Sequence, residues 1–131
     1  MKTTAERLLI KPGMRVRILG EEPATEHVSR LGPLPAGAKL VDDGTADAVL
    51  LFARSSGAVT QALPVAARSA GPDGLLWLAY PKGSSGLKTD LGRDTMTPLT
   101  DRIASLTGVT LVSIDDTWSA MRLRPSERYR I

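Results

Sequence analysis

Hydrophobic positions along the chain follow two periods, one typical of strands and one typical of helices. Residues 14–19 place apolar side chains at every second position with arginines between them, which predicts a strand. Residues 46–53 and 75–80 are nearly continuous apolar runs, as expected for strands that are covered on both faces. Further strands are predicted over residues 37–43, 109–114 and 118–124.

Three segments between these strands carry helix signals. Residues 23–32 begin near a proline, carry apolar residues at helical spacing and end at a glycine. Residues 58–70 are rich in alanine, and we expect Pro64 to kink this helix or to open a second short one. A third helix is predicted from about Thr89, with a proline restarting it and Gly108 ending it.

The alternation of strands and helices predicts the fold class. It favours an α/β domain with a three-layer, Rossmann-like, mostly parallel sheet, helices on both faces and a C-terminal antiparallel hairpin at the edge. A length of 131 residues fits one domain. We therefore expect a single α/β domain over residues 1–131, with a lead-in over 1–13 and a basic C-terminal tail over 125–131. Because an exposed edge strand tends to be paired or covered, the hairpin is a candidate homodimer contact.

Composition narrows the chemistry that the chain can perform. It contains no cysteine, which excludes disulfides, thiolate metal sites and a cysteine nucleophile. No segment approaches the roughly 18 apolar residues of a membrane span, and the first residues lack the apolar run of a secretory signal. We expect a soluble, cytoplasmic protein that is not exported and has no membrane partner.

The net charge of +3 has much of its excess near the end of the chain, in Arg122, Arg124, Arg128 and Arg130. A basic tail can meet nucleic-acid phosphates, and weak nucleic-acid binding is one alternative function. Charge runs are usually solvated, so we interpret these arginines as a solvated terminus and do not expect nucleic acid as the partner.

Ligands of open α/β sheets bind outside the carboxyl ends of the strands. Four loops are predicted to open on that edge, over residues 20–24, 54–57, 81–88 and 115–117. The third contains YPKGSSG, whose cation, hydroxyls and glycines are suited to holding a phosphate or carboxylate. It is not a Walker A loop, because GxxxxGK[ST] is absent. In the structural alternative, Lys82 of this loop pairs with Asp115 or Asp116.

This loop and the polar residues expected beside it form a candidate binding surface for a small anionic ligand or a protein partner. The candidate residues are Lys82, Ser84, Ser85, Arg93, Asp115, Trp118 and Arg122. Trp118 is alternatively a core anchor, like Trp77, and that interpretation is favoured. We assign no catalytic residue, no metal ligand and no cofactor.

Carboxylates supply the alternative function, a small enzyme acting on a phosphate- or carboxylate-bearing substrate. Asp90 and Asp94 share a helix face at their spacing, and Asp90, Asp94 or Asp115 would serve as general acid or base. Helix capping and local ion pairing are the favoured roles of the first two. His27, the one histidine, is expected on the polar side of its helix without a local partner, and we assign it no catalytic role.

Three segments carry a family resemblance. GLLWLAYPKGSSG, TDLGRD and IDDTWSAMRLRP resemble, in that order, a family of short bacterial proteins classified as domain of unknown function 3052. KPGMRV, LGPLPAGAKLV and ADAVLLFARS also resemble it, so the likeness covers most of the chain. The resemblance implies no particular activity.

A more distant likeness is to the sheet of class I methyltransferases. The loop ILGEEPATEH after the first predicted strand lacks the GxGxG glycines that let the backbone approach a cofactor. Asp42 or Asp43 is a candidate for the acid that grips a ribose, and each suits a turn equally well. The resemblance therefore implies a relative of this fold that has no cofactor.

Overall fold

Six strands form one mixed sheet in the computed structural model, which describes residues 2–129. The strands are β1 (Arg15–Gly20), β2 (Lys39–Leu40), β3 (Ala48–Phe52), β4 (Leu75–Pro81), β5 (Leu106–Ser113) and β6 (Trp118–Pro125). Their order in the sheet is β2-β1-β3-β4-β6-β5. The first four strands pair in parallel, and β6 runs antiparallel to both β4 and β5. This confirms the predicted mostly parallel sheet with a C-terminal antiparallel hairpin.

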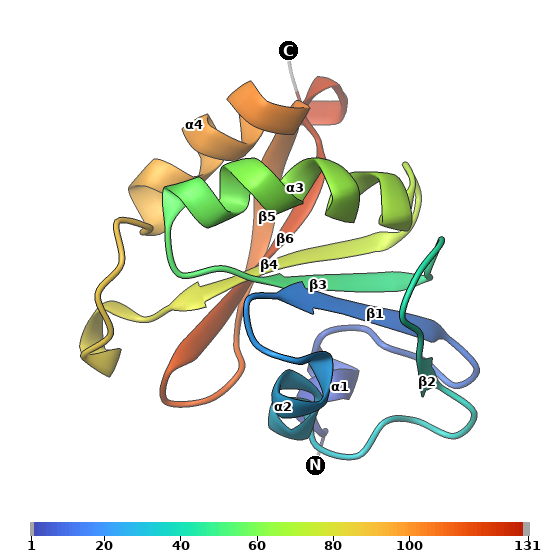
Figure 1. The fold of residues 1–131 in the computed structure, drawn as a ribbon. Helices are drawn as coiled ribbons and strands as arrows, with labels where there is room; N and C mark the ends of the chain where they lie inside the picture. The colour runs from blue at the N-terminus through green and yellow to red at the C-terminus, as the bar shows by residue number, and fades with distance from the viewer. Residues whose placement is uncertain (1, 130–131) are drawn as a thin grey trace.

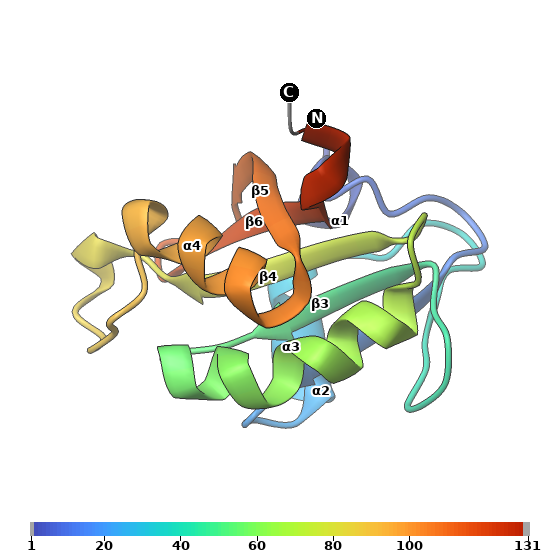
Figure 2. The same cartoon turned by 90° about the horizontal axis from the view of Figure 1, so that it is seen from above.

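Helices cover both faces of the sheet, which gives the predicted three layers (Figure 1). One face carries α1 (Thr4–Arg7), α2 (Ala24–Val28) and the 3₁₀ turn η1 (Ser29–Leu31). The other face carries α3 (Ser56–Ala70) and α4 (Arg93–Ala104), which lie side by side (Figure 2). Two further 3₁₀ turns are η2 (Gly83–Ser85) and η3 (Ser126–Tyr129). No helix of the described residues is long and apolar enough to cross a membrane.

Each helical layer packs on its own core. Because side chains alternate along a strand, β1 sends Val16 and Ile18 toward α1 and α2, and Leu19 toward α3. Every residue of β3 and β4 is buried, which confirms that these two runs are covered on both faces. Trp77 in β4 is 1% exposed, and its indole nitrogen donates a hydrogen bond to the Leu8 carbonyl at 3.0 Å. Trp77 is therefore a satisfied core anchor, as predicted.

The C-terminal hairpin forms one edge of the sheet, as predicted, with its second strand on the inner side. β6 lies between β4 and β5, so the outer strand is β5, which runs in the same direction as β4. Burial explains this order. β6 buries Trp118, Ala120, Met121 and Leu123, whereas most residues of β5 are partly or fully exposed. The strand that carries the large buried side chains Trp118 and Met121 therefore lies between two neighbours.

The proline in the alanine-rich segment does not break its helix. α3 runs continuously through Pro64 from Ser56 to Ala70, so no second helix opens there. A proline removes one backbone donor from the helix, and here Val59, Leu63 and Ala66 hold both halves of α3 on the same core. Tertiary packing therefore outweighs the local preference.

The boundaries of α4 also differ from the expectation. The helix begins at Arg93 rather than near Thr89, and Pro98 lies inside it without restarting it. It ends at Ser105, whose φ of 56° and ψ of 45° are left-handed, so Gly108 is not the terminator and lies within β5. Gly108 lies against Met121 there, and a Cβ would stand 2.2 Å from the Met121 sulfur, so that flexible side chain would have to move.

Part of the predicted basic tail is regular structure. Arg122 and Arg124 lie in β6, and Ser126 in η3 is buried and donates its backbone N–H to the Ser105 carbonyl at 2.8 Å. Arg122 and Arg124 therefore belong to the strand predicted over residues 118–124 and are half-buried, so they are not part of a free terminus. The Arg128 side chain and residue Arg130 lie outside the described part of the chain.

Candidate functional site

The sheet has a topological switch point at β1, where the strand order reverses. β2 pairs with one side of β1, and the next strand along the chain, β3, pairs with the other. Such a switch point leaves a crevice at the carboxyl ends of the strands, where α/β proteins bind ligands. Gly20 at the end of β1 pairs with Phe52 at the end of β3, and Pro81 at the end of β4 pairs with Trp118 at the start of β6. The four loops singled out from the sequence therefore meet at this edge, as predicted.

Aromatic rings fill the side of the crevice that faces α2. The ring of His27 stacks on that of Phe52, with centroids 3.9 Å apart and planes inclined by 9°. Trp118 meets both rings edge-on, at centroid distances of 5.7 and 5.1 Å. All three side chains are buried. His27 is thus not on the polar side of its helix, because the ring is needed to complete the packing under β1.

Charged side chains connect this aromatic cluster to the loops around it. Glu22 forms an ion pair with Arg54 and places its second oxygen 3.4 Å from His27 Nε2. On the other side of the imidazole, Arg30 Nε donates to His27 Nδ1 at 3.4 Å, and Arg30 also pairs with Asp115 at 3.3 Å. The result is a chain of polar contacts that runs from the loop after β3 to the hairpin turn, with the imidazole between two ion pairs.

The two arginines also flank an indole ring. The guanidinium carbons of Arg30 and Arg54 each lie 5.8 Å from the centroid of the Trp118 ring, within the range of cation–π attraction. Trp118 is 1% exposed, so its role as a core anchor is confirmed. It is a structural centre of the crevice rather than an open pocket wall.

Electrostatics keep His27 neutral. Burial lowers its pKa, and this effect exceeds the opposite effect of the neighbouring Glu22 carboxylate. Because Nδ1 accepts from Arg30, the proton of the neutral ring belongs on Nε2, which faces Glu22. Burial also acts to raise the pKa of Glu22, but a backbone hydrogen bond and the charge of Arg54 hold that pKa below its ordinary value.

Asp90 occupies the N-terminus of the longest helix. Its carboxylate accepts from the Ser56 backbone N–H at 2.8 Å and from the Ser56 hydroxyl at 2.5 Å. The hydroxyl and then the backbone N–H of Ser56 lower the pKa of Asp90. Asp90 therefore caps α3, which confirms capping as its role, although the helix is not its own.

The YPKGSSG loop is held largely by its own contacts. Lys82 Nζ donates to the Ser113 hydroxyl at 2.7 Å, so the expected pairing of Lys82 with Asp115 or Asp116 is replaced by this neutral partner. Ser85 accepts from the Leu87 backbone N–H at 3.2 Å, and Ser84 is exposed. The loop extends from the sheet edge beyond β4 (Figures 1 and 2).

The remaining candidate residues lie apart from one another. Asp115 accepts from the backbone N–H groups of Thr117 and Trp118, both at 2.8 Å, which shapes the hairpin turn beside this loop. Arg122 pairs with Trp77, four positions along β4 from Pro81, and lines a hollow at the opposite edge of the sheet. The Arg93 side chain lies outside the described part of the chain. The structure thus gathers the candidates except Arg122 and Arg93 near one edge, and their binding role stays a prediction.

Sequence reasoning missed the residues that dominate the crevice, namely Glu22, His27, Arg30, Phe52 and Arg54. Only one local signal pointed to them, since His27 and Arg30 are three residues apart and share a helix face. Glu22 and Arg54 lie in two of the four predicted loops, but their pairing joins segments 32 residues apart. Among residues 2–129, no group of three or more His, Cys, Asp or Glu side chains is placed to hold a metal ion.

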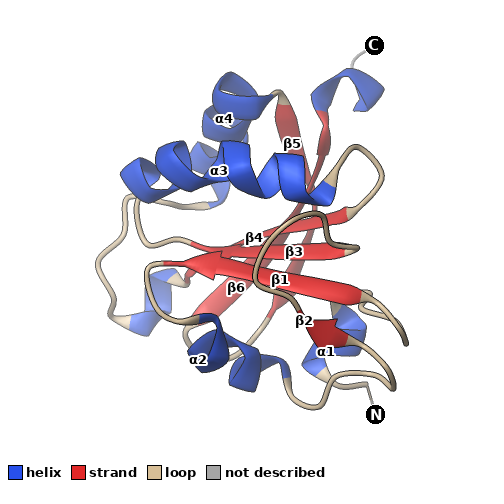
Figure 3. Cartoon of the chain, turned by 45° about the vertical axis from the view of Figure 1, so that its right-hand side comes forward, coloured by secondary structure: helices blue, strands red, loops and turns tan. Residues whose placement is uncertain are grey.

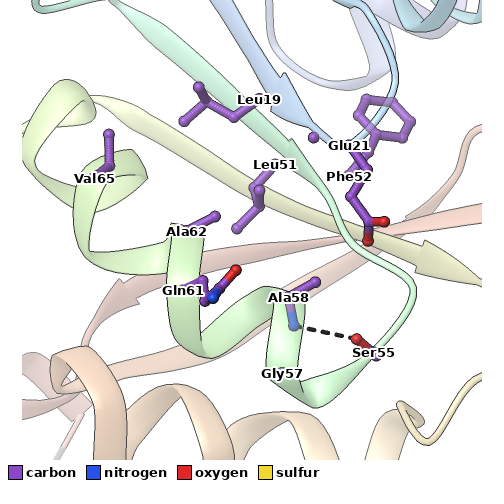
Figure 4. A pocket seen from close by; sticks show the side chains of 11 residues that line it. Leu19, Glu21, Leu51, Phe52, Ser55, Gly57, Ala58, Gln61, Ala62 and Val65 are labelled. Carbon is purple, nitrogen blue, oxygen red and sulfur yellow. Dashed lines mark hydrogen bonds between the residues drawn. The ribbon is translucent and has the colours of Figure 1, made fainter.

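An open groove of about 670 Å³ lies on the other side of the crevice, between β1 and α3. Leu19 and Leu51 project from the strands, and Ala62 and Val65 face them from α3 (Figure 4). Glu21, Ser55 and Gln61 supply polar groups. The groove exists because the connection from β2 to β3 contains no helix. No second helix therefore lies beside α3 to cover this face of β1 (Figure 3).

A second hollow of about 590 Å³ adjoins the groove at Ser55, which lines both. Arg54 lines it from the loop after β3, and Gly83 and Lys88 line it from the YPKGSSG loop and its continuation. A Cβ on Gly83 would meet no atom within 4 Å, so the loop backbone is accessible there. The crevice therefore has three parts. The aromatic cluster fills one side, the apolar groove lies on the other, and the second hollow, called the basic hollow after Arg54 and Lys88, adjoins the groove.

Comparison with known proteins identifies the fold. No protein-family model matches the chain, and no curated protein matches its sequence. An O-methyltransferase from neocarzinostatin biosynthesis, solved with S-adenosylmethionine and 2-hydroxy-5-methyl naphthoic acid, matches with a TM-score of 0.59 and 14% identity over 90% of this chain. The chain spans 50% of that enzyme's length.

Two smaller proteins match over most of both chains. The DhpI–SAH complex has a TM-score of 0.52 and 13% identity, over 93% of this chain and 82% of the other. A cyclopropane-fatty-acyl-phospholipid synthase-like protein from Lactobacillus casei has a TM-score of 0.52 and 12% identity, over 92% and 87%. The chain therefore has the Rossmann-like fold of SAM-dependent methyltransferases, in agreement with the distant likeness inferred from its sequence.

The residues at the switch point do not fit the cofactor that this fold implies. The loop after β1 has one glycine, Gly20, followed by Glu21 and Glu22, and lacks further glycines for a close approach of the backbone. A Cβ on Gly20 would already stand 3.0 Å from the Phe52 carbonyl, and the stacked His27 ring fills the space behind it. α2, which follows this loop, has five residues and no side-chain cap.

The candidate ribose acids are also misplaced. After Asp42 and Asp43 the chain turns away from the crevice, because the Gly44 carbonyl accepts from the Ser69 hydroxyl at 2.6 Å, at the C-terminal end of α3. That end of the helix lies at the opposite edge of the sheet. We therefore derive no methyl-transfer step for this protein.

Proposed function

We propose that this protein is a binding domain on a methyltransferase-type scaffold, and that it holds a small ligand with an apolar body and one carboxylate or phosphate group. The observation that carries the proposal is the junction of the apolar groove and the basic hollow at Ser55. The same junction is the part of the switch-point crevice that the aromatic cluster leaves open.

The apolar groove suits the body of such a ligand. Its volume of about 670 Å³ falls in the range of small-molecule sites, roughly 300–1,000 Å³. Val65 is 38% exposed on its wall, so covering it removes apolar surface from water. Gln61 and Ser55 provide hydrogen-bonding groups that would orient the ligand.

The basic hollow suits the anionic group. Arg54 and Lys88 approach it from different loops, and Gly83 presents an uncovered stretch of backbone between them. The carboxylate of Asp90 also lines the hollow, but both of its oxygens are engaged by Ser56. The N-terminus of α3 is thereby already occupied, and Arg54 is already ion-paired with Glu22. The anion would therefore bind mainly through Lys88, and it would share Arg54 with Glu22.

The enzyme alternative with aspartate acid–base chemistry has weaker support. Asp90 is bound to Ser56 with a lowered pKa, which favours its ionised form and disfavours a general acid. Asp94 is exposed, and Asp115 shapes the hairpin turn. Nucleic-acid binding is also less supported, because Arg122 and Arg124 are strand residues rather than a basic tail. Membership of the family classified as domain of unknown function 3052 stays a prediction.

A thermal-shift screen tests the proposal. The ligands are aliphatic and aromatic carboxylates, sugar phosphates and nucleotides, with S-adenosylmethionine as a separate arm. A ligand at one hundred times its Kd adds about 2.7 kcal/mol to the free energy of unfolding, which is readily measured. Lys88→Ala should reduce the shift given by an amphiphilic anion, whereas the matched variant Lys39→Ala, an exposed lysine on β2, should not.

Three outcomes count against the proposal. Absence of any shift across the screen contradicts ligand binding, and an equal loss in both lysine variants contradicts the location. A shift with S-adenosylmethionine, retained in Lys88→Ala, would contradict both the binding mode and the conclusion that the crevice does not fit this cofactor.

A further inference from the structure

The two edges of the sheet differ in length and in protection. At one edge β2 has two residues, which is too short to template another strand. At the other edge β5 has eight residues, Leu106–Ser113, with the sequence LTGVTLVS. In the described part of the chain, β6 pairs with one side of β5 and no strand pairs with its other side.

β5 lacks two of the features that normally keep an edge strand from pairing. It contains no charged residue and no proline, which are the usual protective devices. Its pairing with β6 is irregular between Gly108 and Thr110 and regular from Thr110 to Ser113. Such an irregularity is itself a protective feature, but it lies in the first half of the strand, and the second half keeps a regular register.

Apolar side chains are exposed along the same strand. Leu111 is 39% exposed and Val109 is 36% exposed. Leu111 pairs with Met121 of β6, which belongs to the core under α3 and α4, so Leu111 extends that apolar face past its last covered strand. A partner that continued the sheet would cover this side chain and satisfy the outer backbone groups together.

We propose that two copies of the chain pair through β5, antiparallel and centred on Thr110–Ser113, so that two six-stranded sheets join into one. A second copy is favoured over another partner because the segment is complementary to itself. A two-fold axis brings identical strands together antiparallel, and the strands themselves carry no charge. The nearest cation, Lys82 Nζ, contacts Ser113 at the end of the paired segment. This inference is independent of the ligand site, which lies at the carboxyl edge of β1 and β3.

Light scattering coupled to size-exclusion chromatography, over a range of protein concentrations, tests the proposal. Wild type should reach twice its monomer mass of 14.0 kDa. Leu111→Lys should return it to monomer mass, because the new charge would lie beside the strand pair. Leu9→Lys is the matched control, since Leu9 is a leucine of equal exposure, at 40%, located outside the sheet, and it should leave the dimer intact.

Amide hydrogen exchange separates the proposal from a folding defect. In wild type, the protection of amides within Thr110–Ser113 should rise with protein concentration, whereas the protection of β3 amides should not change. A wild-type chain that stays monomeric up to millimolar concentration overturns the proposal. A dimer that survives in folded Leu111→Lys, or a dimer without added protection in this segment, also overturns it.

Discussion

The ring of His27 lies 3.9 Å from the ring of Phe52 and is nearly parallel to it. This stack joins α2 to the end of β3 across the switch point, at the place where the fold would otherwise leave space for a ligand. It has two consequences. The stack buries a titratable imidazole, and it leaves no space for a side chain at Gly20.

Stability should depend on pH through His27. The pKa of this histidine is about 6.5 in the unfolded chain and lower in the folded protein, so below pH 6.5 the unfolded state binds more protons. The stabilisation is therefore fully present above pH 6.5 and is lost as pH falls toward the folded-state pKa, by at most about 1.4 kcal/mol per pH unit.

Urea unfolding between pH 7 and pH 5 measures this dependence. His27→Phe keeps a ring against Phe52 and removes the one titrating histidine, so its free energy of unfolding should be nearly flat across that window. Carboxylates with lowered pKa values, such as Glu22, act in the same direction, mainly below about pH 5, and affect both proteins alike at the lower end of the window. An identical slope in wild type and His27→Phe contradicts the assignment.

Gly20→Ala should destabilise the protein by about 1–3 kcal/mol, as expected for overpacking. The added methyl group would stand 3.0 Å from the Phe52 carbonyl oxygen and 3.3 Å from the Phe52 Cβ, and a paired strand cannot easily give way. Gly57→Ala is the control, because its methyl group has space in the first turn of α3 and should stabilise by roughly 0.5 kcal/mol. Chemical denaturation of both variants measures the difference.

Glu21→Gln should strengthen the binding of an anionic ligand. Glu21 is exposed and lines the apolar groove, so its charge repels an anion held nearby at Arg54 and Lys88. Removing one charge at about 8 Å through water should raise affinity roughly two- to threefold at low salt. Isothermal titration with the carboxylate that gives the largest thermal shift measures the change. Weaker binding would contradict the predicted repulsion between Glu21 and the bound anion.

Ser105→Gly should stabilise the protein by about 0.5–1 kcal/mol, because glycine adopts the left-handed conformation at the end of α4 without strain. The control is Ser29→Gly at the end of α2, where the serine is right-handed and glycine brings no such relief. Thermal unfolding should move in opposite directions for the two variants. A lower melting temperature for Ser105→Gly contradicts the strain argument.

Periodicity and turn chemistry were enough to predict the strands, the fold class and the edge at which the loops meet. These features depend on local patterns, such as the buried runs of β3 and β4, that a sequence displays directly. The end of α4 was missed because Ser105 adopts a left-handed conformation that glycine usually marks. The sequence places a glycine, Gly108, three residues later, and the helix was therefore predicted to end there. In the structure Gly108 lies in β5 against Met121.

The composition of the crevice was less predictable. His27 lies among polar neighbours in the sequence, and its burial depends on Phe52 and Trp118, which are 25 and 91 residues away. Long-range pairing of this kind leaves no periodic signal in a single sequence. The position of β6 inside the sheet was hidden for the same reason, because both strands of the hairpin carry similar alternating patterns.

The insertion of β6 between β5 and β4 also constrains the order of folding during synthesis. β5 emerges from the ribosome first, but its place in the sheet is defined only through β6, which follows it. Until residues 118–125 are available, β4 carries an unpaired apolar edge and α4 has an incomplete surface to pack on. The four parallel strands can form early, whereas the last third of the chain must dock as a unit, a late step that leaves the nascent chain open to aggregation.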